Sequence, residues 1–168
     1  MNATLAGRVL PMQEADEDAR RFESVYRDHY GSVHAYARRR LPERADDVVA
    51  ETFLVAWRRL EHLPREPLPW LYGIARRVLS DLRRGAHRQD AVAERIAREP
   101  ANELAEIPDR ELASALATLS ERDRELLLLV YWEDLEPAQA ARVVGCSRAA
   151  AATRLWRARA RLKERLEG

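Results

Sequence analysis

Apolar residues recur at intervals of three and four along most of the chain, and this spacing limits the fold more than any other feature. The clearest runs are Phe22 to Leu41, Ala45 to Leu60 and Leu71 to Leu82. Because an α-helix turns once in about 3.6 residues, each run places its apolar side chains on one helical face. Glycine is rare, with six among 168 residues, and runs of β-branched residues are few. We therefore predict an all-α protein.

Prolines and a glycine set the expected ends of the first three helices. Pro42 ends the first helix, a proline-rich segment follows the second, and the third begins after Pro69 and stops near Gly85. Three such helices can bury their apolar stripes against one another as a small bundle. We assign this bundle to residues 20–85 and treat residues 1–19 as an N-terminal extension.

The second half of the chain begins with an acidic segment. Residues 89–111 carry seven acidic residues against three arginines, and two prolines interrupt a weak periodicity. We interpret residues 86–110 as a linker and residues 111–168 as a second helical domain. The expected architecture is two small helical domains joined by an acidic linker.

Local signals divide the second domain into helices. Ser120 and Asp123 have the spacing of a capping box, and Pro137 suits a first helical position. Gly145 suits the left-handed residue that ends a helix, and Ser147 can cap the next one. A short helix, a tight turn and a longer helix in this order are typical of a helix-turn-helix.

Charge is distributed in blocks, although the net charge is only +1. Residues 76–88 carry five arginines against one aspartate, and residues 140–168 carry seven arginines and one lysine against two glutamates. Of the 29 cationic residues 28 are arginine, whose planar guanidinium suits phosphate oxygens and base edges. Codon usage in a GC-rich genome would explain the choice of arginine but not its clustering. We therefore expect nucleic acid to contact both basic blocks.

Each basic block has its own pattern. In the last helix, arginines recur every three or four residues along one face, which suits binding to a duplex backbone: Arg154, Arg157, Arg161 and Arg165, with Arg148 and Arg159 nearby. The alternative is a basic surface that is simply solvated. In the third helix, arginines follow two aromatic residues, as in a groove for single-stranded nucleic acid: Trp70, Tyr72, Arg76, Arg77, Arg83 and Arg84. Core packing is an equally open interpretation for Trp70.

The second helix carries Asp46, Asp47 and Glu51 opposite its apolar stripe. Asp47 and Glu51 are four residues apart and share a face. They could be acid/base carboxylates, half of a metal site, a docking patch for a basic partner or simply a charge cluster at a helix start. No histidine follows at metal-ligand spacing on this helix, and Cys146 is the single cysteine, so we expect neither a metal, nor another cofactor, nor a disulfide.

Membrane insertion is not expected. The longest apolar stretch, residues 126–132, is far shorter than the roughly 18 residues of a membrane helix. The N-terminus also lacks a basic start followed by an apolar core. We therefore expect a cytoplasmic protein.

Three segments in order resemble one bacterial family, and the likeness covers about residues 22–166. The segments are DDVVAETFLVAWRRL at 46–60, PLPWLYGIARRVLSDLRR at 67–84 and ALATLSERDRELLLLVYWEDLEPAQAARVVGCSRAAAATRLWRARARL at 115–162. The chain is similar to extracytoplasmic-function sigma factors. The resemblance implies a sigma-2 domain that binds core RNA polymerase and opens the minus-10 element, and a sigma-4 domain that reads the minus-35 element.

The residue patterns and the resemblance together suggest roles for single positions. The core-polymerase-binding set is Asp46, Asp47, Glu51 and Phe53, and the minus-10 and melting set is Trp70, Tyr72, Arg76, Arg77, Arg83 and Arg84. The minus-35 set is Arg148, Thr153, Arg154, Arg157 and Arg161. Arg77 replaces the family's common asparagine, and Ala150 and Ala151 replace Thr-Val after the turn. We expect Arg148 to read bases and Arg157 to contact phosphates.

The expected partners are core RNA polymerase, promoter DNA and an anti-sigma factor. The chain ends soon after its last helix, so we expect no large C-terminal regulatory domain and control by a separate protein. Two alternatives remain. A helix-turn-helix regulator acting without polymerase would leave the motifs at 45–84 unexplained, and a small helical enzyme using Asp47 and Glu51 would need histidine or carboxylate partners.

Overall fold

The computed structural model describes residues 2–5, 8–90, 104 and 107–167. Most of these residues are helical, which confirms the all-α prediction. Besides the loops between helices, the described residues include one short antiparallel pair of strands at the N-terminus, β1 (Asn2–Leu5) and β2 (Arg8–Pro11). Four-residue strands are too short to give a recognisable alternation, so the sequence did not predict them.

The first three long helices form the expected bundle. They are α1 (Met12–Arg40), α2 (Ala45–Arg58) and α3 (Pro67–Asp90), and each contacts the other two. Short 3-10 turns at Pro42–Arg44 and Leu60–His62 follow α1 and α2. Helix α1 begins earlier than expected because residues 12–19 contain neither glycine nor proline. Helix α3 continues through Gly85 because one glycine costs a helix only about 1 kcal/mol.

The second half contains α5 (Arg110–Ala117), α6 (Glu121–Tyr131), α7 (Pro137–Val144) and α8 (Arg148–Glu167). The predicted local signals are confirmed here. The Ser120 hydroxyl accepts from the Asp123 amide at 3.2 Å, and the Ser147 hydroxyl accepts from the Ala150 amide at 3.1 Å. Gly145 ends α7 in the left-handed region, with φ +76°.

Part of the expected linker can be compared with the structure. Helix α3 extends to Asp90, and residues 91–103 and 105–106 lie outside the described residues. Leu104 and Ile107 are buried and belong to the hydrophobic core. The expected linker therefore contributes two side chains, Leu104 and Ile107, to the hydrophobic core in addition to connecting the two halves.

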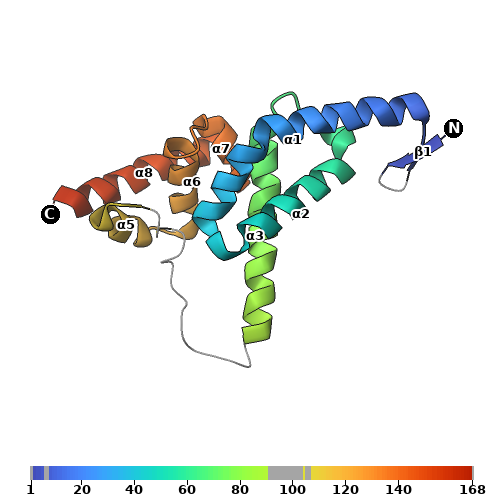
Figure 1. Cartoon of the computed structure of the whole chain (residues 1–168). Helices are drawn as coiled ribbons and strands as arrows, with labels where there is room; N and C mark the ends of the chain where they lie inside the picture. Colours follow the sequence, from blue (N-terminus) through green and yellow to red (C-terminus); the bar gives the residue numbers. More distant parts are fainter. Residues whose placement is uncertain (1, 6–7, 91–103, 105–106, 168) are drawn as a thin grey trace.

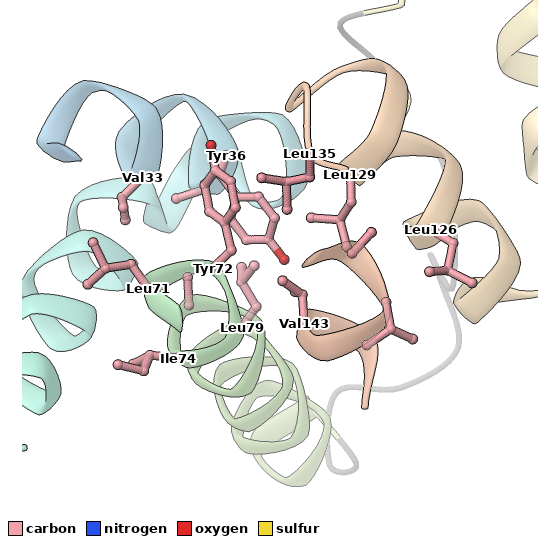
Figure 2. Packing of buried hydrophobic residues seen from close by; sticks show 14 of the residues in the cluster. Val33, Tyr36, Leu71, Tyr72, Ile74, Leu79, Leu126, Leu129, Leu135 and Val143 are labelled. Carbon is pink, nitrogen blue, oxygen red and sulfur yellow. The ribbon is translucent and has the colours of Figure 1, made fainter. Parts of the chain in front are cut away.

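The two halves lie side by side, with α6 and α7 against α1 and α3 (Figure 1). Their buried side chains form one continuous cluster across the boundary (Figure 2). The first half contributes Val33, Tyr36, Leu71, Tyr72 and Leu79, and the second half contributes Leu126, Leu129, Leu135 and Val143. Among the described residues, no helix is both long and apolar enough to cross a bilayer.

Candidate functional surfaces

An open groove of about 830 Å³ runs between α2 and α3. Its floor is apolar, and Leu54 remains exposed there. Asp47 and Glu51 lie at its α2 side, both exposed, and Asp47 accepts a hydrogen bond from Arg44 at 2.6 Å. Asp46 is exposed but does not line the groove, and one of its carboxylate oxygens lies 3.4 Å from the ring of His34 in α1. Charged residues of both signs line the groove: Asp47, Glu51 and Asp81 with Arg44, Arg59 and Arg77. An apolar floor between charged edges suits an amphipathic helix of a partner protein.

Phe53 does not lie on that surface. Its side chain is only 3% exposed, and its ring packs against the rings of Phe22, Tyr26 and Tyr30 at centroid distances of 4.7 to 6.4 Å. A buried ring cannot touch a docked protein directly. Phe53 therefore acts through folding, because it holds α2 against α1.

The candidate melting residues of α3 point in different directions. Arg77 and Arg84 are exposed, and Arg84 pairs with Asp81 one turn earlier. Trp70 and Arg76 are half-buried, and Arg83 donates to the backbone carbonyl of Arg40 at 3.1 Å. The six predicted residues therefore do not form one continuous exposed surface.

Tyr72 is the clearest departure from a DNA-contacting role. Its side chain is 2% exposed and its hydroxyl lies 3.5 Å from a carboxylate oxygen of Glu133, in the second half. Burial raises the pKa of the Tyr72 phenol, and the nearby Glu133 carboxylate raises it further. In this arrangement Tyr72 is a packing residue.

A second open cleft, of about 940 Å³, lies where α3 meets α7. Its walls carry five arginines and one glutamate, together with Trp70. The arginines are Arg59, Arg65, Arg76, Arg77 and Arg142. This strongly basic lining with an aromatic side chain fits an anionic ligand that has stacking groups, such as unpaired nucleotides.

Helix α8 follows the tight Gly145 turn, as a recognition helix does. Arg148, Arg157 and Arg161 are exposed, and the Thr153 hydroxyl donates to the Ala149 carbonyl at 3.0 Å. Arg154 instead donates to Asp123 of α6 at 2.9 Å. It thereby ties α8 to α6, which leaves it less available to DNA than the three exposed arginines.

The Asp123 carboxylate is well suited to hold Arg154. Burial tends to raise the pKa of Asp123, but hydrogen bonds from Ser120 and Arg154 outweigh it, and the pKa lies below its usual value. The charged form is therefore favoured at neutral pH.

The sequence analysis did not single out Trp156, which is 71% exposed in the middle of α8. It lies next to the buried Leu155 and on the face opposite the packed alanines. A tryptophan just outside the apolar stripe of a basic helix is the signal that could have identified it.

Two family models match the chain, one in each half. "Sigma-70 region 2" matches residues 25–89, and "Sigma-70, region 4" matches residues 109–162. The RNA polymerase sigma factor CnrH of Cupriavidus metallidurans is 33% identical, over 99% of this chain and 97% of its own length. The ECF RNA polymerase sigma factor SigL of Mycobacterium tuberculosis is 30% identical, over 84% and 86% of the two chains. The chain belongs to the extracytoplasmic-function sigma factors.

Another relative is longer. The probable RNA polymerase sigma factor RfaY of Xanthomonas campestris is 35% identical over 73% of this sigma factor, which spans only 34% of RfaY. Its additional length therefore lies outside the comparison.

Solved structures agree with the fold of this sigma factor. The sigma factor RpoE, in a co-crystal structure with the anti-sigma factor NepR from Bartonella quintana, matches with a TM-score of 0.67 and 25% identity, over 88% of this chain and 98% of RpoE. CnrH in complex with the cytosolic domain of CnrY matches with a TM-score of 0.64 and 28% identity, over 92% and 93%. Sigma factors are non-enzymatic transcription initiation factors, which gives the chain its general function.

Proposed function

We propose that this alternative sigma factor binds core RNA polymerase through the α2–α3 groove and reads the minus-35 element through α8. Residues 20–85 then act as the sigma-2 domain and residues 111–168 as the sigma-4 domain, with the acidic linker between them. We also propose that α3 contacts the opened minus-10 element and that the protein works in the cytoplasm, where its polymerase is.

The observation that carries this proposal is the exposed pair Asp47 and Glu51 at the α2 edge of a groove with an apolar floor. A protein whose only partner is DNA gains nothing from exposed carboxylates above an apolar floor, whereas a polymerase-binding subunit does. The DNA contacts are then made by the basic helix α8 and by the basic cleft beside α3, which shares Arg59, Ile74 and Arg77 with the groove.

Two solved complexes support one further partner. RpoE is bound to the anti-sigma factor NepR, and CnrH is bound to the cytosolic domain of CnrY. We propose that a separate anti-sigma factor likewise binds this chain and competes with polymerase for it.

Charge reversal at the groove tests the polymerase contact. Asp47→Arg combined with Glu51→Arg should weaken co-purification with core RNA polymerase, while stability should change by about 0.5 kcal/mol or less, as for surface substitutions. Glu17→Arg with Glu23→Arg, on exposed positions of α1, is the matched control and should leave assembly unchanged. Normal holoenzyme assembly by the groove variant would refute the docking assignment.

A further inference from the structure

Helix α8 has a packed side and a free side. It packs against α5, α6 and α7 at the outer edge of the second half, with Ala151, Leu155 and Ala158 buried (Figure 1). Because successive helical residues are rotated by about 100°, residues spaced by four, three and four lie on one side of the helix. Four exposed residues with this spacing form the side that points away from the core: Ala149, Thr153, Trp156 and Ala160.

This outer side of α8 is mainly apolar. Ala149 and Ala160 present only methyl groups. The Thr153 hydroxyl donates its proton to the Ala149 carbonyl at 3.0 Å, so that proton is not available to a base. The indole N–H of Trp156 is the one remaining side-chain donor of the four residues. Direct hydrogen bonding from this side to bases is therefore limited to a single group.

Trp156 is the largest side chain on the outer side, and it is 71% exposed. Among the described residues, no large hydrophobic side chain is more exposed. Single exposed hydrophobic residues are common in folded proteins, so exposure alone does not indicate a contact. Its position does, because it lies in the middle of the free side of the helix that follows the tight Gly145 turn.

Basic residues border the outer side on both edges. Arg157 and Arg161 lie along one edge, and Arg159 and Lys163 lie along the other, all of them exposed. A helix with cations on both edges can contact the phosphates of both strands while its middle faces the base pairs of the major groove. The charges thus turn the apolar side, and Trp156 with it, toward the bases.

The side remains apolar only in the first part of the helix. Glu164 and Glu167 follow on the same side near the C-terminal end, where phosphates would repel them. The N-terminal part of a recognition helix is the part that reaches base edges. The apolar side therefore coincides with the part of α8 that enters the groove.

The apolar group that bases present in the major groove is the C5-methyl group of thymine. Alanine and threonine methyl groups and aromatic rings can pack against it, and its burial is favourable. A polar base edge covered by the same side would lose water without gaining a hydrogen bond, which is costly. The outer side of α8 therefore favours thymine over bases that present only donors and acceptors.

We propose that Trp156, with Thr153 and the two alanines beside it, makes this sigma factor read thymine methyl groups in the minus-35 element. Trp156 is then the specificity-determining residue of α8, while Arg157 positions the helix on the backbone. The inference rests on the proposed function of α8 and adds which base is preferred and through which contact.

Replacement of thymine by deoxyuridine tests the methyl contact, because it removes the methyl group and keeps the hydrogen bonds of the base pair. The probes are promoters selected from a random pool by core RNA polymerase assembled with this protein, and the upstream element that they share is the site. Each thymine of this element is replaced in turn on both strands. At one or two positions we expect binding to weaken about fourfold, the effect of one buried methyl group.

Trp156→Ala tests the assignment to this residue. In at least one of these positions the variant should bind the thymine and deoxyuridine duplexes equally, and Trp156→Phe should keep part of the discrimination. Arg157→Met, on the same helix, is the matched control and should weaken binding to both duplexes by the same factor. Because both side chains are exposed, helix content by circular dichroism should stay unchanged.

The outcomes separate this inference from the proposed function. A polymerase assembled with the wild-type protein that selects no shared upstream element would refute the proposed function of α8. A shared element in which no deoxyuridine replacement weakens binding would refute the methyl contact alone, and so would full discrimination in Trp156→Ala. Relaxation of a guanine position by Trp156→Ala, without any effect of deoxyuridine, would show that the indole N–H reads a base instead.

Discussion

Arg154 provides a sharp test of which residues of α8 contact DNA. The resemblance places it among the minus-35 residues, whereas the structure pairs it with Asp123 of α6 at 2.9 Å. The two side chains are 38% and 15% exposed, so the pair lies between a surface salt bridge and a buried one. Exposed pairs contribute about 0.2 to 1 kcal/mol and charged hydrogen bonds about 1.5 to 3 kcal/mol. After allowance for solvent screening we expect a coupling of about 1 kcal/mol.

A double-mutant cycle measures this coupling. Arg154→Met keeps the aliphatic stem and Asp123→Asn keeps the shape of the carboxylate, so each single change removes mainly the charge pair. Urea unfolding of the wild type, both single variants and the double variant gives the interaction energy. Arg154→Met should also leave the salt dependence of duplex binding unchanged, while Arg157→Met, at an exposed position, should lower the slope by about one. Zero coupling together with a lowered slope for Arg154→Met would show that Arg154 contacts phosphate instead.

Three further substitutions have expected outcomes. Gly145→Ala should destabilise the protein by about 1 kcal/mol, because its φ of +76° disfavours a side chain even though the added methyl would meet no atom. Gly31→Ala within α1 should stabilise the protein by about 0.5 to 1 kcal/mol, because alanine loses less conformational freedom in a helix. Thermal unfolding measures both changes and their opposite signs. Phe53→Ala should cost about 3 to 5 kcal/mol, while Phe53→Leu should keep both the fold and polymerase binding in a pull-down assay. Burial tends to raise the pKa of Glu125, but the neighbouring Arg40 outweighs burial, so the pKa lies below its usual value. The free energy of unfolding should therefore fall as the pH drops below about 4.5. Glu125→Gln should reduce this loss when unfolding is measured as a function of pH.

Local features of the fold could be predicted from the sequence because their causes are local. The caps at Ser120 and Ser147 and the turn at Gly145 each depend on a few neighbouring residues, and all three are confirmed. The apolar stripes likewise identified the helices, because the 3.6-residue period does not depend on what covers the stripe.

The contact between the halves could not be predicted in the same way. The apolar stripe predicted for the third helix consists of Leu71, Ile74, Ala75, Val78 and Leu82. Helix α3 also buries Tyr72 and Leu79, which lie outside that stripe and belong to the core shared with the second half. The side chains that cover a helical face can come from distant parts of the chain. Arg40, for example, pairs with Glu125, 85 positions away. Arginine and glutamate normally indicate a solvated surface, so the sequence predicted no buried role for either residue.

The two surfaces proposed for the first half are both open while α3 is packed against α7, but not every predicted residue is accessible on them. The α2–α3 groove is open, and Asp47 and Glu51 at its edge are exposed. Tyr72 is covered by the second half, and Arg76 faces Glu125. Under the proposed function, polymerase can therefore dock on the groove, and unpaired nucleotides can reach Trp70, Arg76 and Arg77 in the open basic cleft, whereas they can reach Tyr72 only when the halves separate.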